Sequence, residues 1–211
     1  MKSRIQSALL STVAILGVLT YLPGCATTGM DRATKTTDTM QVLQNDYRQA
    51  SIQISATNKS LASLILPTQA DTSKAYDVYT KDVKKMEDLG NRLNQHTEKM
   101  QNQRDAYFSE WESSYANPDI QKLSEQRRIE MRAVYAKIPE ASVGVKGALQ
   151  SYLADTTEIQ RYLSNDLTPQ GIESIRPIAR RAIMDGDRVQ ESIRSLLIAV
   201  DQAKAGMTQG N

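Results

Sequence analysis

The 211-residue sequence is poor in the residue types that build most catalytic and metal sites. It has one cysteine and one histidine, which excludes an intrachain disulfide framework, multi-histidine metal sites and almost every catalytic triad. Its ten glycines, six prolines, nine tyrosines, one tryptophan and one phenylalanine are too few for a β-sandwich or barrel, which needs a turn about every ten residues. The sequence contains no phosphate-binding glycine loop, nucleophile elbow or HExxH pattern. We therefore expect no enzyme, no catalytic residue and no metal site.

The first 24 residues have the composition of a secretory signal peptide. Lys2 and Arg4 form a short positive region, and residues 8–22 are uncharged and mostly apolar. A membrane-spanning helix needs about 20 apolar residues, so this run is short for a stable span. It has the length of a signal-peptide core. We expect residues 1–24 to be removed.

The segment Leu22-Pro23-Gly24-Cys25 resembles the lipobox of bacterial lipoproteins, with Leu22, Pro23 and Gly24 as the signal peptidase recognition site. The resemblance implies a diacylglycerol on the Cys25 sulfur, cleavage after Gly24, and acylation of the freed amine by a fatty acid such as palmitate. Pro23 departs from the usual Ala, Ser or Thr. The alternatives are an ordinary cysteine after a secretory cleavage site, or a failed stop-transfer segment. Two or three acyl chains form an effectively permanent anchor.

Ala26 follows the lipobox cysteine. An Asp at that place resembles the inner-membrane retention signal of enteric-type bacteria, so Ala26 implies transfer to the outer membrane, with the protein facing the periplasm. We expect no cofactor apart from the covalent diacylglycerol and N-acyl chain on Cys25.

The charge of the mature chain is balanced. Removal of the signal peptide takes away Lys2 and Arg4 and no acidic residue, which lowers the basic count from 26 to 24 against 24 acidic residues. A neutral, finely mixed surface has no electrostatic footprint for DNA or RNA. We therefore expect no nucleic-acid partner.

The mature chain is patterned as an elongated antiparallel bundle of about four long helices with coiled-coil-like packing. Residues 25–38 are small and polar, and we interpret them as a lipidated N-terminus and flexible tether. From residue 39 to 206, apolar residues recur at alternating spacings of three and four. Residues 207–211 are predicted to be a polar, frayed tail.

Prolines mark the expected helix boundaries. Pro67 ends the first helix, and the pairs Asn117-Pro118 and Thr168-Pro169 each combine an N-cap residue with proline at the first helical position.

Prolines and glycines also lie inside the predicted helices. Pro139 predicts a kink or break in the third helix and Pro177 a bend in the fourth. Gly144, Gly147 and Gly186 either allow close helix approach or merely weaken their helices.

Several segments carry a family resemblance, and they are Tyr107-Phe108-Ser109-Glu110-Trp111-Glu112, Leu123-Ser124-Glu125, Tyr135, Tyr152-Leu153 and Asn165-Asp166-Leu167. With them the chain, from about Met40 to Ala203, resembles a family of helical bacterial lipoproteins catalogued as domain of unknown function 2959. The resemblance implies an all-α exported lipoprotein. It implies no activity, ligand or catalytic residue.

Three groups of side chains are candidates for function. Tyr107, Phe108, Trp111 and Tyr115 are either bulky filler at the bundle end or an aromatic anchor surface for a partner. His96 lies on the apolar seam. A histidine at such a place is more often a hydrogen-bonded core or edge residue than a metal ligand or a catalytic base.

The third group is made of arginines. They form one cluster on the third helix and one on the fourth, namely Arg127, Arg128 and Arg132, and Arg176, Arg180 and Arg181. The two interpretations are a solvated face with ordinary ion pairs and a site for anionic lipid, lipopolysaccharide phosphate or cell-wall carboxylate.

Together these features predict an outer-membrane-anchored periplasmic lipoprotein that acts as a non-enzymatic structural, scaffold or adaptor protein of the cell envelope. The expected partners are the membrane, through the lipid anchor, and another envelope protein. The alternative is a chaperone-like or lipid-cargo-binding lipoprotein, which predicts a large apolar patch or an open groove between helices. Heptad patterns occur in helices that pack within one chain and in helices that pack between chains. The pattern therefore agrees with both a monomer and a homo-oligomer.

Overall fold

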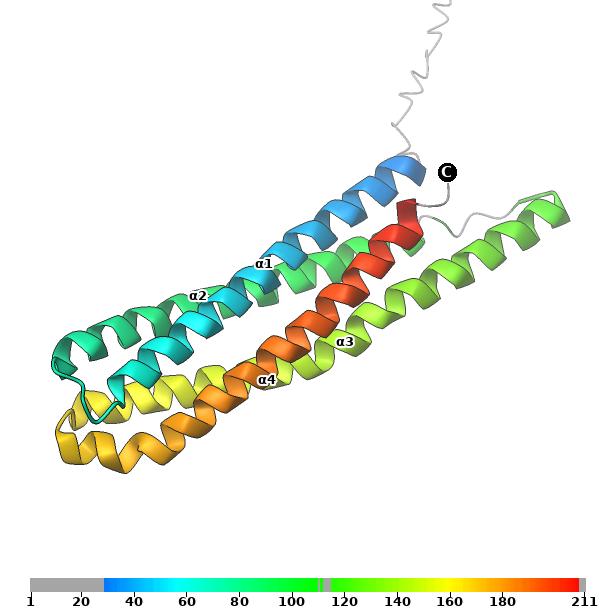
Figure 1. Ribbon diagram of the computed structural model, residues 1–211. Coiled ribbons are helices and arrows are strands. Elements are labelled where there is room, and N and C mark those ends of the chain that lie inside the picture. Colours follow the sequence, from blue (N-terminus) through cyan, green and yellow to red (C-terminus); the bar gives the residue numbers. More distant parts are fainter. Residues whose placement is uncertain (1–28, 110, 112–114, 209–211) are drawn as a thin grey trace, which may run out of the picture.

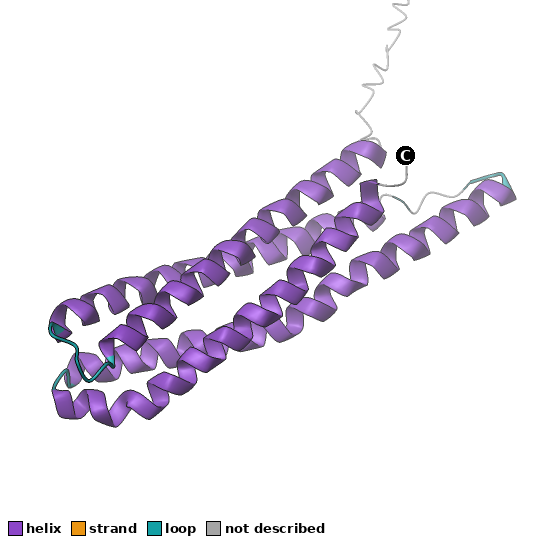
Figure 2. Ribbon diagram, in the orientation of Figure 1, coloured by secondary structure: helices purple, strands orange, loops and turns teal. Residues whose placement is uncertain are grey.

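The computed structural model describes residues 29–109, 111 and 115–208. It contains four helices, α1 (Gly29–Leu64), α2 (Thr72–Ser109), α3 (Pro118–Asn165) and α4 (Pro169–Thr208). They lie side by side as an elongated bundle (Figure 1). Figure 2 shows helices and connecting loops, and no strand, in the described part of the chain. The all-α bundle predicted from the heptad pattern is confirmed.

The helices run alternately up and down the bundle, so each end collects different parts of the chain (Figure 1). The start of α1, the end of α2, the start of α3 and the end of α4 lie at what we call the Gly29 end. The α1–α2 and α3–α4 connections lie at the opposite end, which we call the Pro67 end. α1 packs closely on α2 and α4, and α3 on α4, whereas α2 and α3 make the sparsest contacts of these neighbours.

The predicted cap residues begin α3 and α4. The side chain of Asn117 accepts a hydrogen bond from the backbone N–H of Asp119 at 2.9 Å. The hydroxyl of Thr168 accepts one from the backbone N–H of Gly171 at 3.1 Å. Each bond satisfies a donor that the first helical turn would otherwise leave without a partner.

The internal prolines do not break their helices. α3 continues through Pro139 and α4 through Pro177, so of the kink or break predicted in the third helix, the break is excluded. A proline inside a helix costs about 3 kcal/mol. Burial of one large aliphatic side chain contributes about 1.5–3 kcal/mol, and buried residues such as Ile138 and Val145 flank Pro139 on both sides. Packing therefore holds α3 together.

Both ends of the helical domain extend beyond the predicted boundaries. α1 begins at Gly29, so most of the tether predicted over 25–38 is helical. The cause is tertiary, because Thr36 is completely buried in the bundle. α4 ends at Thr208, which places the first part of the 207–211 tail in the helix.

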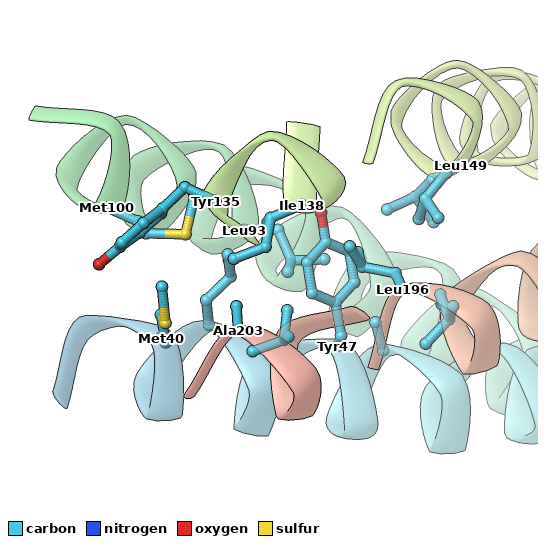
Figure 3. Packing of buried hydrophobic residues seen from close by; sticks show 14 of the residues in the cluster. Met40, Tyr47, Leu93, Met100, Tyr135, Ile138, Leu149, Leu196 and Ala203 are labelled. Carbon is cyan, nitrogen blue, oxygen red and sulfur yellow. The ribbon is translucent and has the colours of Figure 1, made fainter. Parts of the chain in front are cut away.

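The buried side chains form two hydrophobic clusters along the bundle. The smaller one fills the Pro67 end. The larger one extends to the Gly29 end, and Figure 3 labels its members Met40, Tyr47, Leu93, Met100, Tyr135, Ile138, Leu149, Leu196 and Ala203. All four helices contribute to the larger cluster, so the bundle is stabilised as one unit.

A layer of buried polar residues joins three helices near the middle of the bundle. The Asn58 amide donates to the carbonyl of Ile183 at 2.9 Å and to the carboxylate of Asp187 at 3.1 Å. The Tyr152 hydroxyl donates to the Asn58 side-chain oxygen at 2.9 Å. A Cβ on Gly186 would lie 2.7 Å from the Asn58 amide and 2.8 Å from the Tyr152 ring. Gly186 therefore permits close helix approach, and the layer fixes the register of the helices.

Candidate functional site

The predicted lipidation site lies outside the described residues. This applies to the recognition residues Leu22, Pro23 and Gly24, to the attachment residue Cys25, and to the sorting residue Ala26. Lipid attachment and sorting therefore stay predictions.

The four predicted aromatic residues do not form one exposed surface. Tyr107 and Phe108 are buried, and their rings meet edge to face at 5.2 Å. Phe108 packs on Tyr135 of α3 at 5.4 Å, and Tyr107 on the half-buried Trp111 at 5.4 Å. Only Tyr115 is exposed, at 40%. Tyr107 and Phe108 are thus core filler at the Gly29 end, and Tyr115 alone is available to a partner.

The two arginine clusters lie at opposite ends of the bundle, so they do not make a single anion site. Arg127 donates to the carbonyl of Gly206 at 3.4 Å, near the end of α4. Arg176 donates to the carbonyl of Ile65 at 3.0 Å, just after α1. Cations at these positions satisfy carbonyls that a helix end leaves without an intrahelical partner. Both arginines have structural partners.

His96 belongs to a small polar cluster that the sequence pattern did not reveal. Its Nδ1 contacts the Asp46 carboxylate, and the other carboxylate oxygen lies 3.1 Å from Nε of Arg92. Asp46 is buried, with 7% of its surface exposed. The sequence contained one signal for the burial of Asp46, which is that it directly precedes Tyr47, a residue of the apolar stripe. The cluster connects α1 to α2.

A groove of about 780 Å³ lies between α2 and α3, where the helix contacts are sparsest. Its apolar floor contains the buried residues Tyr47, Leu93, Val145 and Leu149. Figure 3 shows Tyr47, Leu93 and Leu149 among the core side chains that come from different helices. The polar side chains along its rims are Glu87, Asn91, Asn94, Thr97, Glu98 and Gln101 on α2, and Ser142, Lys146 and Gln150 on α3. The volume lies within the range of about 300–1,000 Å³ that is usual for ligand sites.

Gly90 on α2 marks a point where the two facing helices touch, whereas two glycines of α3 are exposed to open space. A Cβ on Gly90 would lie 2.9 Å from Cδ1 of Leu153, so α2 and α3 touch there. Gly144 and Gly147 precede Leu153 on α3. A Cβ added at either of them would have no atom within 4 Å. A second hollow of about 510 Å³ shares Pro139 with the groove and continues between α2 and α3 toward the Gly29 end. Gly144 and Gly147 therefore permit no close helix approach in the bundle.

One polar atom lies in the groove floor. The phenol of Tyr47 lies near the Thr97 hydroxyl, which donates to the carbonyl of Leu93 at 2.7 Å. Burial raises the pKa of Tyr47, and the neighbouring Thr97 hydroxyl opposes this shift in part. Tyr47 is therefore an uncharged hydroxyl at neutral pH, and the floor carries no charge where a ligand would lie.

The described residues form neither a metal-binding group nor a membrane-spanning helix. Within 29–109, 111 and 115–208, no three His, Cys, Asp or Glu side chains come together as a metal-binding group. Among the described helices, none has the length and apolarity that crossing a membrane requires.

No protein-family model, curated protein or solved structure matches the chain. The functional assignment therefore depends on the side chains described above.

Proposed function

We propose that the protein is a lipoprotein of the outer membrane, facing the periplasm, that acts as a non-enzymatic adaptor of the cell envelope. On this proposal Cys25 carries the acyl chains, and the bundle presents the α2–α3 groove to another envelope protein. The proposed membership of the helical lipoprotein family, domain of unknown function 2959, agrees with an exported, lipid-anchored protein.

The observation that carries the adaptor proposal is the chemistry of the groove. The floor offers apolar side chains, which an apolar stripe on a partner helix can cover. The rims offer uncharged amides, including Asn91, Asn94 and Gln150, which donate and accept hydrogen bonds. Such a lining suits a partner polypeptide, because an acyl chain would leave these amides without partners.

Site-specific crosslinking in intact cells tests the adaptor role. A photoreactive amino acid at Val143, which lines the groove and is 74% exposed, is compared with the same group at Ile52, which is 70% exposed on α1 and lies outside the groove. We expect one discrete envelope protein to be captured from position 143 and not from position 52. Equal capture from both positions, or none from position 143, would contradict the proposal.

The anchor is tested by Cys25→Ala. We expect this variant to lose both fatty-acid labelling and removal of the signal peptide. In the proposed processing, diacylglycerol is attached to the Cys25 sulfur before the signal peptide is cleaved. A Cys25→Ala protein that is still processed and still held in the membrane would count against the anchor.

The same groove favours a second candidate function, which is binding of lipid or unfolded cargo. This alternative predicts that a dye for apolar surfaces binds the folded protein, and that lipid co-purifies with it. A purified protein that contains lipid, and whose position 143 captures no protein in cells, would favour cargo binding over the adaptor role.

A further inference from the structure

The first turns of α3 project past the rest of the bundle at the Gly29 end. Arg127 meets the carbonyl of Gly206 close to the end of α4, so residues 118–126 lie beyond α4. At 1.5 Å per residue this projection is about 14 Å long. Figure 1 shows the start of α3 extending past the ends of the neighbouring helices.

The projecting segment continues the apolar face that α3 buries elsewhere. Ile120 and Leu123 share one helix face with Met131, which is 2% exposed in the core. Ile120 itself is 46% exposed and Leu123 is 68% exposed. Tyr115, 40% exposed, lies just before the helix. The stripe therefore extends beyond the part of the bundle that covers it.

The relative heights of α1 and α3 follow from one contact between them. The Tyr135 hydroxyl lies near the Thr36 hydroxyl, so these two residues are at about the same height along the bundle. Gly29 precedes Thr36 by seven residues and Pro118 precedes Tyr135 by 17. At 1.5 Å per residue, α1 extends about 10 Å above that level and α3 about 25 Å. The tip of α3 is thus about 15 Å beyond the start of α1.

The length of chain between Gly29 and the proposed anchor matches this difference. At about 3.3–3.6 Å per residue, the chain from Cys25 to Gly29 reaches at most about 14 Å. A bilayer that holds the acyl chains of Cys25 therefore lies no further from the bundle than the tip of α3 does.

We propose that residues 115–126 dock on the lipid surface that holds the anchor, with Ile120 and Leu123 in the headgroup region. The inference rests on the proposed acylation of Cys25. Tyrosine is favoured at membrane–water interfaces, where Tyr115 would lie. The docked segment sets the orientation of the bundle, because a tether alone would leave the bundle free to rotate.

The single tryptophan of the chain allows a direct test. In a Trp111→Phe background, Leu123→Trp is compared with Leu66→Trp, because Leu66 is similarly exposed, at 53%, but lies at the Pro67 end. The chain from Cys25 onward is coupled through the Cys25 thiol to a maleimide lipid, which reproduces the length of the proposed tether. The vesicles contain phosphatidylethanolamine and phosphatidylglycerol, with acyl chains brominated close to the headgroup.

We expect tryptophan at position 123 to show blue-shifted emission and several-fold stronger bromine quenching than tryptophan at position 66. Equal, weak quenching at both positions would overturn the proposal. Shielding at position 123 that rises with protein concentration, without bromine quenching, would also overturn it and would assign the face to a second copy of the chain.

A second comparison retains Trp111. The untethered chain should float with the same vesicles less after Leu123→Glu than after Leu66→Glu, and equal flotation would count against docking. Fatty-acid labelling in cells is measured separately. If the label is absent but tryptophan at position 123 is still quenched, the proposed acylation of Cys25 is wrong. If the label is present but tryptophan at position 123 stays in water, the proposed docking is wrong.

Discussion

Replacement of Gly186 by alanine has two opposing effects on the free energy of unfolding. In an exposed helix, alanine is more favourable than glycine by about 1 kcal/mol. At Gly186 the added Cβ would lie 2.7 Å from the Asn58 amide and 2.8 Å from the Tyr152 ring. Overpacking of this kind costs about 1–3 kcal/mol, and disruption of the hydrogen bonds of Asn58 adds about 1–3 kcal/mol. We therefore expect Gly186→Ala to destabilise the bundle by about 1–5 kcal/mol.

Gly147→Ala is the matched control for this substitution. Its Cβ would meet no atom within 4 Å, so the helix propensity should act alone and stabilise the bundle by up to about 1 kcal/mol. Urea unfolding of both variants, followed by circular dichroism, measures the two changes. The reasoning is refuted if Gly186→Ala raises the unfolding midpoint as Gly147→Ala does, because the polar layer would then impose no steric limit.

Two further predictions concern buried polar groups. Burial raises the pKa of Tyr79 and of Tyr152 above the ordinary value of 10.0, so above pH 10 the folded state retains protons that the unfolded state loses. The contribution of these two tyrosines to stability should therefore be fully present below the unfolded pKa and be lost as the pH rises above 10. Urea unfolding across that pH range measures this, and a midpoint unchanged well above pH 10 would contradict it. Asp46→Ala should lower the free energy of unfolding by about 1–3 kcal/mol, because it removes the buried carboxylate that pairs with His96 and Arg92. The same urea assay measures it, with Asp46→Asn as the variant that keeps the volume, and a wild-type midpoint for Asp46→Ala would show that the pair contributes nothing.

Local signals in the sequence were sufficient for most helix boundaries. Asn117 and Thr168 bond to backbone donors two or three residues away, so their capping role depends only on neighbouring sequence. The break that was one of the two alternatives predicted at Pro139 is absent for the opposite reason. The local cost of the proline predicts a break, but the side chains that hold α3 together pack on other helices, and a local pattern does not contain them.

The candidate site depended on tertiary structure to a greater extent. Tyr47 and Leu149 belong to the apolar pattern that runs through residues 39–206, and they are buried. The pattern did not show that they would form the floor of an open groove. The heptad seam specifies which face of each helix is apolar, but it does not specify how closely two particular helices approach.

By itself, the sequence determined that the chain forms four amphipathic helices in an all-α bundle, because apolar spacing and proline caps act within a single helix. Only the tertiary structure decided that α2 and α3 leave a groove, that Gly186 faces Asn58, and that α3 extends past its neighbours. These features depend on the distances and axial offsets between helices. Such distances are set by many side chains that are far apart along the chain, such as Gly90 and Leu153.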